Sequence, residues 1–164
     1  AGKYPVETVT AMANVCVGAE QHRSVNISNH RIELTFTEVS ETIALSAMYA
    51  ANHLEGVKAI ISLTESGQTS KLMSRITSGL PIFSLSRHPK TLNKTAIYRG
   101  VYPIEFDSTD VNNDNLSDEM LQVVSGQIDL AVGDKLILTH GDMMETVGAS
   151  NTLKVLTVTK KHLK

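Results

Sequence analysis

The sequence is poor in cysteine and in aromatic residues. It has one cysteine, Cys16, and no tryptophan among 164 residues. A single thiol can form neither an internal disulfide nor the cysteine pairs that bind zinc or carry redox chemistry. Aromatic residues make up 4% of the chain, so we expect no stacking platform for single-stranded nucleic acid. No stretch of about 18 apolar residues occurs, and no membrane-spanning helix is expected.

Neither sign of charge is in large excess. The formal net charge is −2, which gives no global field toward nucleic acid or a membrane surface. The length suits one domain with an aliphatic core. The single thiol fits a reducing compartment, so we expect a cytoplasmic protein. The first five residues, Ala1 to Pro5, have no initiator methionine and no signal-peptide pattern, which indicates a fragment or a processed product.

The loop after residues 57–63 is dense in hydroxyl groups. An apolar run from Val57 to Leu63 leads into Thr64, Ser66, Thr69 and Ser70, with Gly67 among them and a helical pattern beyond. A strand, a hydroxyl-rich loop and a helix start together form a common phosphate-binding arrangement. The alternative is structural: a serine or threonine caps the helix and the glycine permits the turn. Neither the P-loop signature nor G-x-G-x-x-G is present, and both readings stay open.

Hydrophobic periodicity predicts an alternation of strands and helices. Expected helices cover 5–20, a segment from 37 or 40 to just before Gly56, 66–77, 89–98 and 116–128. Expected strands cover 57–63, 82–86, 101–106, 135–139 and 153–159, and 32–36 reads as a strand or an extended linker. Pro103, inside the strand expected over 101–106, indicates either a strand end or a strand at the sheet edge. Residues 141–152 read as a long loop, and 160–164 as a solvated basic terminus.

This order predicts an α/β fold: a three-layer α/β/α sandwich around a five-stranded, mostly parallel sheet. The last strand is expected to run antiparallel to the fourth. Ligands of such sheets bind at the carboxyl ends of the strands. We therefore expect the loops 64–70, 86–88 and 141–151 to converge on one crevice.

Other chemistry has weaker sequence support. The six histidines show no metal-binding spacing. Arg87 follows a strand end, where it either reaches a ligand or forms an ion pair. A small independent enzyme, such as a phosphosugar isomerase, would have to use His88, His140, Asp142 and Glu145, which form no organised motif. The lone thiol lies on an apolar helix face, where inert burial is expected.

Several short motifs occur in a distinctive order along the chain: Leu63-Thr64-Glu65-Ser66-Gly67, Ser74-Arg75, Pro81-Ile82, Ser86-Arg87, Tyr98-Arg99-Gly100-Val101-Tyr102-Pro103, Gly133-Asp134 and Gly148-Ala149-Ser150-Asn151-Thr152. Taken together, they resemble the C-terminal domain of pyruvate kinase. The opening, Gly2-Lys3-Tyr4-Pro5, is similar to the last helix of the family's catalytic (β/α)8 barrel. The resemblance covers nearly the whole chain. It implies that residues 1–22 are a remnant of that helix with a linker, and that 23–164 form the effector-binding domain.

The resemblance also implies what the chain lacks. The parent enzyme would convert phosphoenolpyruvate and ADP to pyruvate and ATP in the last step of glycolysis. Its active site, with ligands for Mg²⁺ and K⁺, would lie in the barrel upstream of Ala1, so no catalytic or metal-binding residue and no cofactor are expected in this fragment. The parent would be a homotetramer that dimerises through this domain, where the strand 153–159 pairs with its symmetry mate. The barrel itself is a further expected partner.

The resemblance assigns an allosteric site. By position it makes Thr64, Ser66, Gly67, Gln68 and Thr69 the site for an effector phosphate. The loop containing Gly141, Gly148 and Ser150 would close over the effector. Asp142 and Glu145 would repel a second phosphate, and 114–128 contains no arginine or tryptophan to bind one. This favours a sugar monophosphate or AMP, as in the similar bacterial isoenzyme. The alternative is a stand-alone phosphometabolite-binding or scaffold protein.

Overall fold

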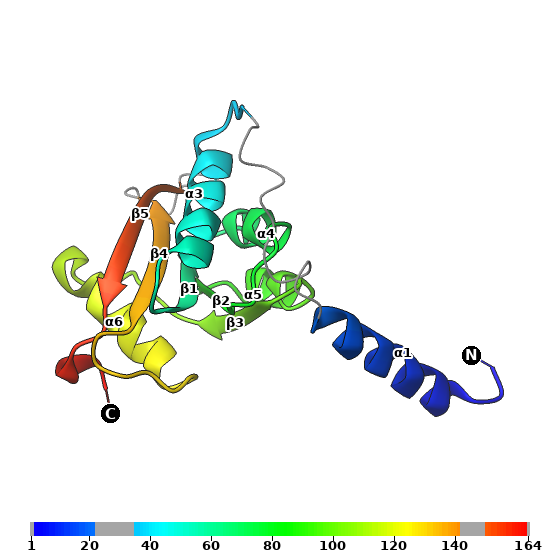
Figure 1. Cartoon of the computed structure of the whole chain (residues 1–164). Coiled ribbons are helices and arrows are strands. Elements are labelled where there is room, and N and C mark those ends of the chain that lie inside the picture. Colours follow the sequence, from blue (N-terminus) through cyan, green and yellow to red (C-terminus); the bar gives the residue numbers. More distant parts are fainter. Residues whose placement is uncertain (1, 22–34, 142–149, 164) are drawn as a thin grey trace.

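The computed structural model describes residues 2–21, 35–141 and 150–163 (Figure 1). Helices and strands alternate through most of the chain, as the sequence predicts. The elements are α1 (Pro5–Glu20), α3 (Val39–His53), β1 (Val57–Leu63), α4 (Gln68–Ser74), β2 (Ile82–Ser86), α5 (Pro89–Thr95), β3 (Val101–Glu105), α6 (Asn113–Ser125), β4 (Lys135–Gly141), β5 (Ser150–Thr157) and the 3₁₀ helix η1 (Lys160–His162).

The five strands form one sheet in the order β3-β2-β1-β4-β5. The first four strands in this order run parallel, and β5 runs antiparallel to β4. Pro103 lies on the edge strand β3 opposite Ser84, where a missing N–H on the outer side costs no ladder bond. The predicted α/β class, the mixed sheet and the edge position of this proline are confirmed.

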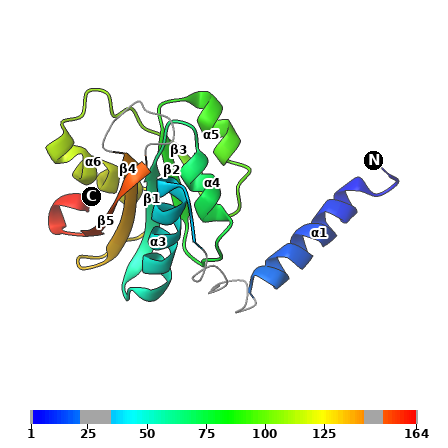
Figure 2. The ribbon, with the colours of Figure 1, turned by 90° about the horizontal axis from the view of Figure 1, so that it is seen from above.

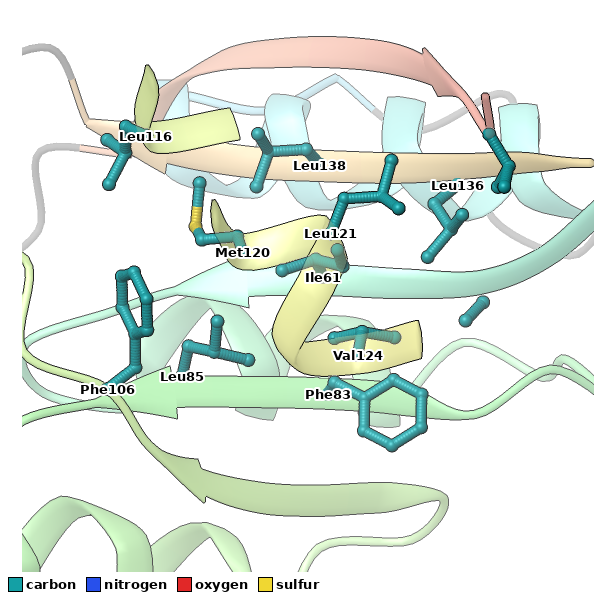
Figure 3. Packing of buried hydrophobic residues seen from close by; sticks show 12 residues of the cluster. Ile61, Phe83, Leu85, Phe106, Leu116, Met120, Leu121, Val124, Leu136 and Leu138 are labelled. Carbon is teal, nitrogen blue, oxygen red and sulfur yellow. The ribbon is translucent and has the colours of Figure 1, made fainter. Parts of the chain in front are cut away.

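Helices cover both faces of the sheet (Figure 2). Side chains that alternate along the central strands enter two cores. On one face Met48 of α3 and Met73 of α4 pack against Ile60. On the other face Met120 and Leu121 of α6 pack over the central strands (Figure 3). The three-layer arrangement therefore buries most of β1 on both faces, as its mainly apolar sequence without polar alternation predicts.

Three helices differ from their predicted bounds. The helix expected over 66–77 begins at Gln68 and ends at Ser74, where i→i−3 bonds replace the α-helical pattern: Ile76 N donates to Met73 O at 2.9 Å. The helix expected to reach residue 98 ends at Thr95 for the same reason. The last helix begins before residue 116, because the side chain of Asn112 caps it by accepting a bond from Asp114 N at 3.0 Å.

The loop expected over 141–152 is shorter, because its ends belong to the strands. Gly141 pairs with Ser150, and His140 pairs with Thr152. The fifth strand correspondingly ends at Thr157, two residues before the predicted end. Of the segment expected over 32–36, residues 32–34 lie outside the described part of the chain, and 35–36 form no strand.

The helix α1 has no buried residue, and Figure 1 shows it apart from the sheet. Valines 6, 9 and 17 are exposed, and so is Cys16. Inert burial of this thiol is expected for the intact protein, and exposure is expected when the helix is isolated from the barrel. The apolar side chains of α1 meet no covering surface among the described residues. In the described residues no helix has the length and apolar character needed to cross a membrane.

The C-terminal tail is not a solvated terminus, contrary to prediction. His162 is buried, with 4% of its surface exposed. Its Nδ1 accepts a bond from Thr159 N at 3.0 Å, and its Nε2 lies 3.0 Å from Oδ1 of Asp118 on α6. Lys161 Nζ lies 2.5 Å from the other carboxylate oxygen. The tail is therefore fastened to α6 by one carboxylate.

Replacing Lys161 by glutamine is expected to raise the pKa of Asp118. The hydrogen bond from Lys161 is the largest cause that lowers this pKa below 3.8, and the bond from His162 is the second. Because the folded pKa is lowered, the carboxylate adds stability above its unfolded pKa. This contribution is lost as the pH falls through the folded value. Carboxyl ¹³C titration by NMR measures the shift, and an unchanged pKa in Lys161→Gln would contradict the assignment.

Candidate functional site

The hydroxyl-rich loop lies at the point where the direction of chain progression in the sheet reverses. From β1 the chain passes through α4 to β2 on one side, while β4 lies on the other side of β1. Ser62 pairs with Thr139, so Thr64 and Gly141 follow at neighbouring carboxyl ends. Crevices outside the carboxyl ends of the strands at such a switch point are the usual ligand sites of open α/β sheets.

Gly67 is fixed by both its backbone and its surroundings. Its φ of +75° is left-handed, and it occupies the N-cap position of α4. A Cβ built on it would lie 2.6 Å from Cγ2 of Thr95 on α5. Only glycine fits this position without strain. The structural alternative proposed a serine or threonine as the helix cap and Gly67 as the residue that permits the turn. Neither Ser66 nor Thr69 occupies the N-cap position, and Gly67 both caps the helix and permits the turn.

Two loop hydroxyls accept hydrogen bonds from the backbone. Thr64 Oγ1 accepts from Gly67 N at 3.0 Å, and Ser66 Oγ accepts from Gln68 N at 3.4 Å. A hydroxyl that accepts a bond still has its own proton to donate. Both side chains therefore retain a donor for an oxyanion while their oxygen atoms hold the loop in shape.

A third donor arises where β5 meets α4. Thr69 Oγ1 and Ser150 Oγ lie 2.6 Å apart, both buried. One hydroxyl donates to the other, and the accepting hydroxyl keeps its proton for a ligand. Ser70 donates to Ser84 Oγ at 2.8 Å, so its proton is used within the protein. Of the predicted residues, the structure thus brings Thr69 and Ser150 into direct contact across 81 positions of sequence.

The helix α5 supports the loop from outside, which the sequence reading missed. Thr91 Oγ1 donates to Glu65 O at 2.7 Å, and Lys94 Nζ donates to Ser66 O at 3.1 Å. Thr91 and Thr95 are buried one turn apart on the same helix face. The available sequence signal was the pair Thr91 and Thr95, which lie at i and i+4 in the helix after β2 and therefore share one helix face.

The negative charge in the loop is matched by nearby cationic groups. The carboxylate of Glu65 contacts Nε2 of His88 and lies 3.7 Å from Nη2 of Arg87. Arg87 also donates to Thr109 Oγ1 at 2.7 Å. The pKa of Asp107 is lowered chiefly by hydrogen bonds from the side chain and backbone of Thr109. Electrostatic interaction with Arg87 and His88 lowers it further. Arg87 therefore forms an ion pair, with Glu65. The Glu65 carboxylate lies next to His88, the N-cap residue of α5.

The remaining predicted residues have different positions. Gly141 ends β4, whereas Gly148, Asp142 and Glu145 lie outside the described residues. The two histidines at strand ends are separated by β1: His88 contacts the Glu65 carboxylate, and the Nδ1 of His140 lies 3.1 Å from Gly141 O. In the described ranges no group of three or more histidine, cysteine or acidic side chains could hold a metal ion.

A hollow of about 760 Å³ lies at the opposite, amino end of the sheet. Its lining includes Leu80, Arg99, Tyr102 and Ile128. None of the predicted phosphate-binding residues contributes to it. The candidate phosphate site is therefore the hydroxyl-lined loop, and the hollow is a separate feature.

Comparison with known proteins identifies the family. Residues 41–156 match the family described as pyruvate kinase, alpha/beta domain. The chain is 54% identical to pyruvate kinase II of Salmonella typhimurium and 52% identical to pyruvate kinase of Buchnera aphidicola subsp. Schizaphis graminum; each alignment covers 96% of this chain and 33% of the relative. Identity to the Candida albicans pyruvate kinase is 30%, over 94% of this chain and 32% of the relative.

These matches agree with the motif resemblance, and the two bacterial relatives are more similar to the chain than the fungal one. The chain spans about a third of the length of the curated relatives that it matches. From the family match and the identity over nearly its whole length, the chain belongs to the pyruvate kinase family and corresponds to its C-terminal alpha/beta domain.

Proposed function

We propose that this chain is the regulatory and oligomerisation domain of a pyruvate kinase, and that its 64–70 loop binds the phosphate of an allosteric activator. The observation that carries the proposal is the set of hydroxyl donors around Gly67, at the carboxyl end of β1. The backbone N–H groups of Thr69 and Ser70, in the first turn of α4, have no intrahelical acceptor and add further donors. Hydroxyl and amide donors around one glycine are suited to the oxygens of a phosphate.

A single phosphate fits this domain better than two. The helix α6 packs on the face of the sheet opposite α3 and α4. It has no lysine or arginine between Asn113 and Ser125. Its charged residues Asp114, Asp118 and Glu119 are all acidic, and like charges disfavour a second anion there. The effector is therefore a sugar monophosphate or AMP.

The chemistry of the parent enzyme belongs to the barrel. We propose that the whole protein transfers phosphate from phosphoenolpyruvate to ADP, with Mg²⁺ and K⁺ bound by residues outside this chain. No step is assigned to the described residues, which contain no cluster suited to a metal ion. The exposed apolar side chains of α1, Val6, Val9 and Val17 among them, would pack against that barrel.

Calorimetric titration of the 164-residue chain tests the effector role. Ribose 5-phosphate, glucose 6-phosphate and AMP are the ligands, and unphosphorylated ribose is the control. We expect millimolar or tighter binding of at least one phosphate compound and none of ribose. Absence of binding by all three phosphates, with a cooperative melting transition retained, would contradict the effector role and leave the family assignment intact.

The outer edge of β5 supports the oligomerisation role. This strand pairs with β4 on one side only and forms an end of the sheet. Val155 on β5 is 47% exposed. An open strand edge with an exposed apolar side chain is a template for pairing with another strand. We propose that β5 pairs antiparallel with β5 of a second copy.

Replacing Val155 by lysine is expected to shift the chain from dimer to monomer. Around a two-fold axis the substitution brings two like charges near each other and removes apolar contact area. Light scattering across a concentration series measures the change. Val132→Lys, at an exposed valine before β4, is the matched control and should remain dimeric. A wild-type chain that is monomeric at all concentrations would rule out the proposed pairing.

A further inference from the structure

His140 contains a buried polar atom without a protein partner. The residue is 8% exposed, and its Nε2 makes no hydrogen bond among the residues that the structure describes. Leaving a buried polar group unsatisfied costs roughly 1–3 kcal/mol. Such groups are uncommon in native proteins and call for an explanation. A ligand that completes the hydrogen bond is one explanation, because it makes up for the cost when it binds.

The other ring nitrogen fixes the chemistry of the unpartnered one. Nδ1 of His140 lies 3.1 Å from the carbonyl oxygen of Gly141. A carbonyl oxygen only accepts, so Nδ1 carries the proton and donates it. In the neutral ring Nε2 is then an acceptor. For the neutral ring, the group that satisfies Nε2 supplies an O–H or an N–H, which a fully ionised phosphate does not.

His140 lies at the carboxyl end of β4, next to the loop of the candidate site. Thr139, the residue before it, pairs with Ser62, so His140 and Gly141 lie beside the last residue of β1 and the first residue of the phosphate loop. Alternation along β4 directs its side chain to the same face as Leu138, the face covered by α6. In Figure 3 Leu116 of α6 lies toward this end of β4.

The loop hydroxyls and the His140 ring therefore lie on opposite faces of the sheet, both at the carboxyl ends of β1 and β4. Thr69 approaches from α4 on one face and is joined to Ser150 at the start of β5. His140 approaches from the other face, next to Gly141, which pairs with that same serine. A ligand whose phosphate lies in the loop and whose body extends over β4 would pass the His140 ring.

We propose that Nε2 of His140 accepts a hydrogen bond from a sugar hydroxyl of the bound effector. The inference rests on the proposed phosphate site and adds a second contact to it. His140 is then the residue that distinguishes a hydroxyl-bearing phosphate ester from an alkyl phosphate. A buried acceptor built for a hydroxyl rejects ligands that lack one, because binding them leaves the acceptor unpaired.

A cycle of two ligands and two proteins tests this role. Ribose 5-phosphate and butyl phosphate, which lacks hydroxyls, are titrated into the wild-type chain and into His140→Phe. We expect the variant to bind ribose 5-phosphate about tenfold more weakly, the loss of one hydrogen bond, and to bind butyl phosphate within about twofold of wild type. His140→Gln, which keeps an acceptor, should restore part of the preference.

The variant is expected to fold, because an apolar ring replaces a partly unsatisfied one in a buried position. His53→Phe is the matched control: its Nδ1 also bonds a carbonyl, that of Tyr49, but it lies at the other end of the sheet. Should His140→Phe not melt cooperatively, His140→Leu and His140→Gln form the test pair.

The outcomes separate the two proposals. If the wild-type chain binds neither phosphate ester, the phosphate site and the hydroxyl contact both fail. If it binds both esters but His140→Phe weakens them equally, or weakens neither, the phosphate site stands and the hydroxyl contact is refuted.

Discussion

Replacing Gly67 by alanine is expected to destabilise the fold by about 2–5 kcal/mol and to weaken phosphate binding at least about tenfold. A non-glycine residue in the left-handed region costs roughly 1–2 kcal/mol, and Gly67 has a φ of +75°. The new Cβ also lies 2.6 Å from Cγ2 of buried Thr95, and such overpacking adds roughly 1–3 kcal/mol. The loop must move away from α5 to relieve the contact.

Two further variants separate backbone strain from the steric clash. Gly100 has a similar φ of +68° but nothing within 4 Å of a built Cβ, so Gly100→Ala carries the strain alone and should leave phosphate binding unchanged. Thr95→Ser removes the clashing methyl group and should restore part of both losses in Gly67→Ala. Urea unfolding and calorimetry measure the two effects. Equal destabilisation by the two alanines would show that the contact with Thr95 does not hold the loop.

Replacing Ser66 by aspartate is expected to weaken phosphate binding by more than about 100-fold. Two unit charges about 4 Å apart repel by roughly 4 kcal/mol at an effective dielectric constant of 20, and tenfold in affinity corresponds to about 1.4 kcal/mol. The fold should change little, because aspartate can accept the bond from Gln68 N that Ser66 Oγ accepts now. The loss is therefore one of binding and not of structure.

Ser78→Asp is a control with the same local geometry. Ser78 Oγ accepts a bond from the N–H two residues ahead, Leu80 N at 3.1 Å, as Ser66 Oγ does. It precedes β2, so it lies at the amino end of the sheet, away from the loop. Binding of ribose 5-phosphate should be lost in Ser66→Asp and kept in Ser78→Asp. Equal binding by both variants would place the phosphate elsewhere.

Local patterns were sufficient to predict most of the fold. The mainly apolar run 57–63, which lacks polar alternation, predicts a strand buried on both faces, and β1 has those bounds. Pro103 predicts a strand end or an edge strand from one missing N–H, and β3 is an edge strand. Helix ends were less predictable, since they depend on single bonds such as the cap from Asn112. A capping asparagine within a polar stretch resembles a loop in sequence.

The site was predictable only where its residues are close in sequence. The hydroxyls at 64, 66 and 69 form a local pattern around one glycine. The contacts that fix them come from elsewhere in the chain: Thr91 holds the loop carbonyl of Glu65 from α5, and Ser150 reaches Thr69 from β5. Long-range pairing of this kind follows from sheet order, which no local motif encodes. The buried position of His162 was missed for the same reason, because its partner Asp118 lies 44 residues away.

The central claim is that the 64–70 loop holds the effector phosphate. The most direct measurement is an NMR titration of the ¹⁵N-labelled chain with ribose 5-phosphate, in which each backbone amide reports its own surroundings. We expect saturable shifts at Gly67, Gln68 and Thr69 with one common affinity, and none at Gly100 at the opposite end of the sheet. Saturable shifts confined to other residues, with the amides of the loop unchanged, would contradict the claim.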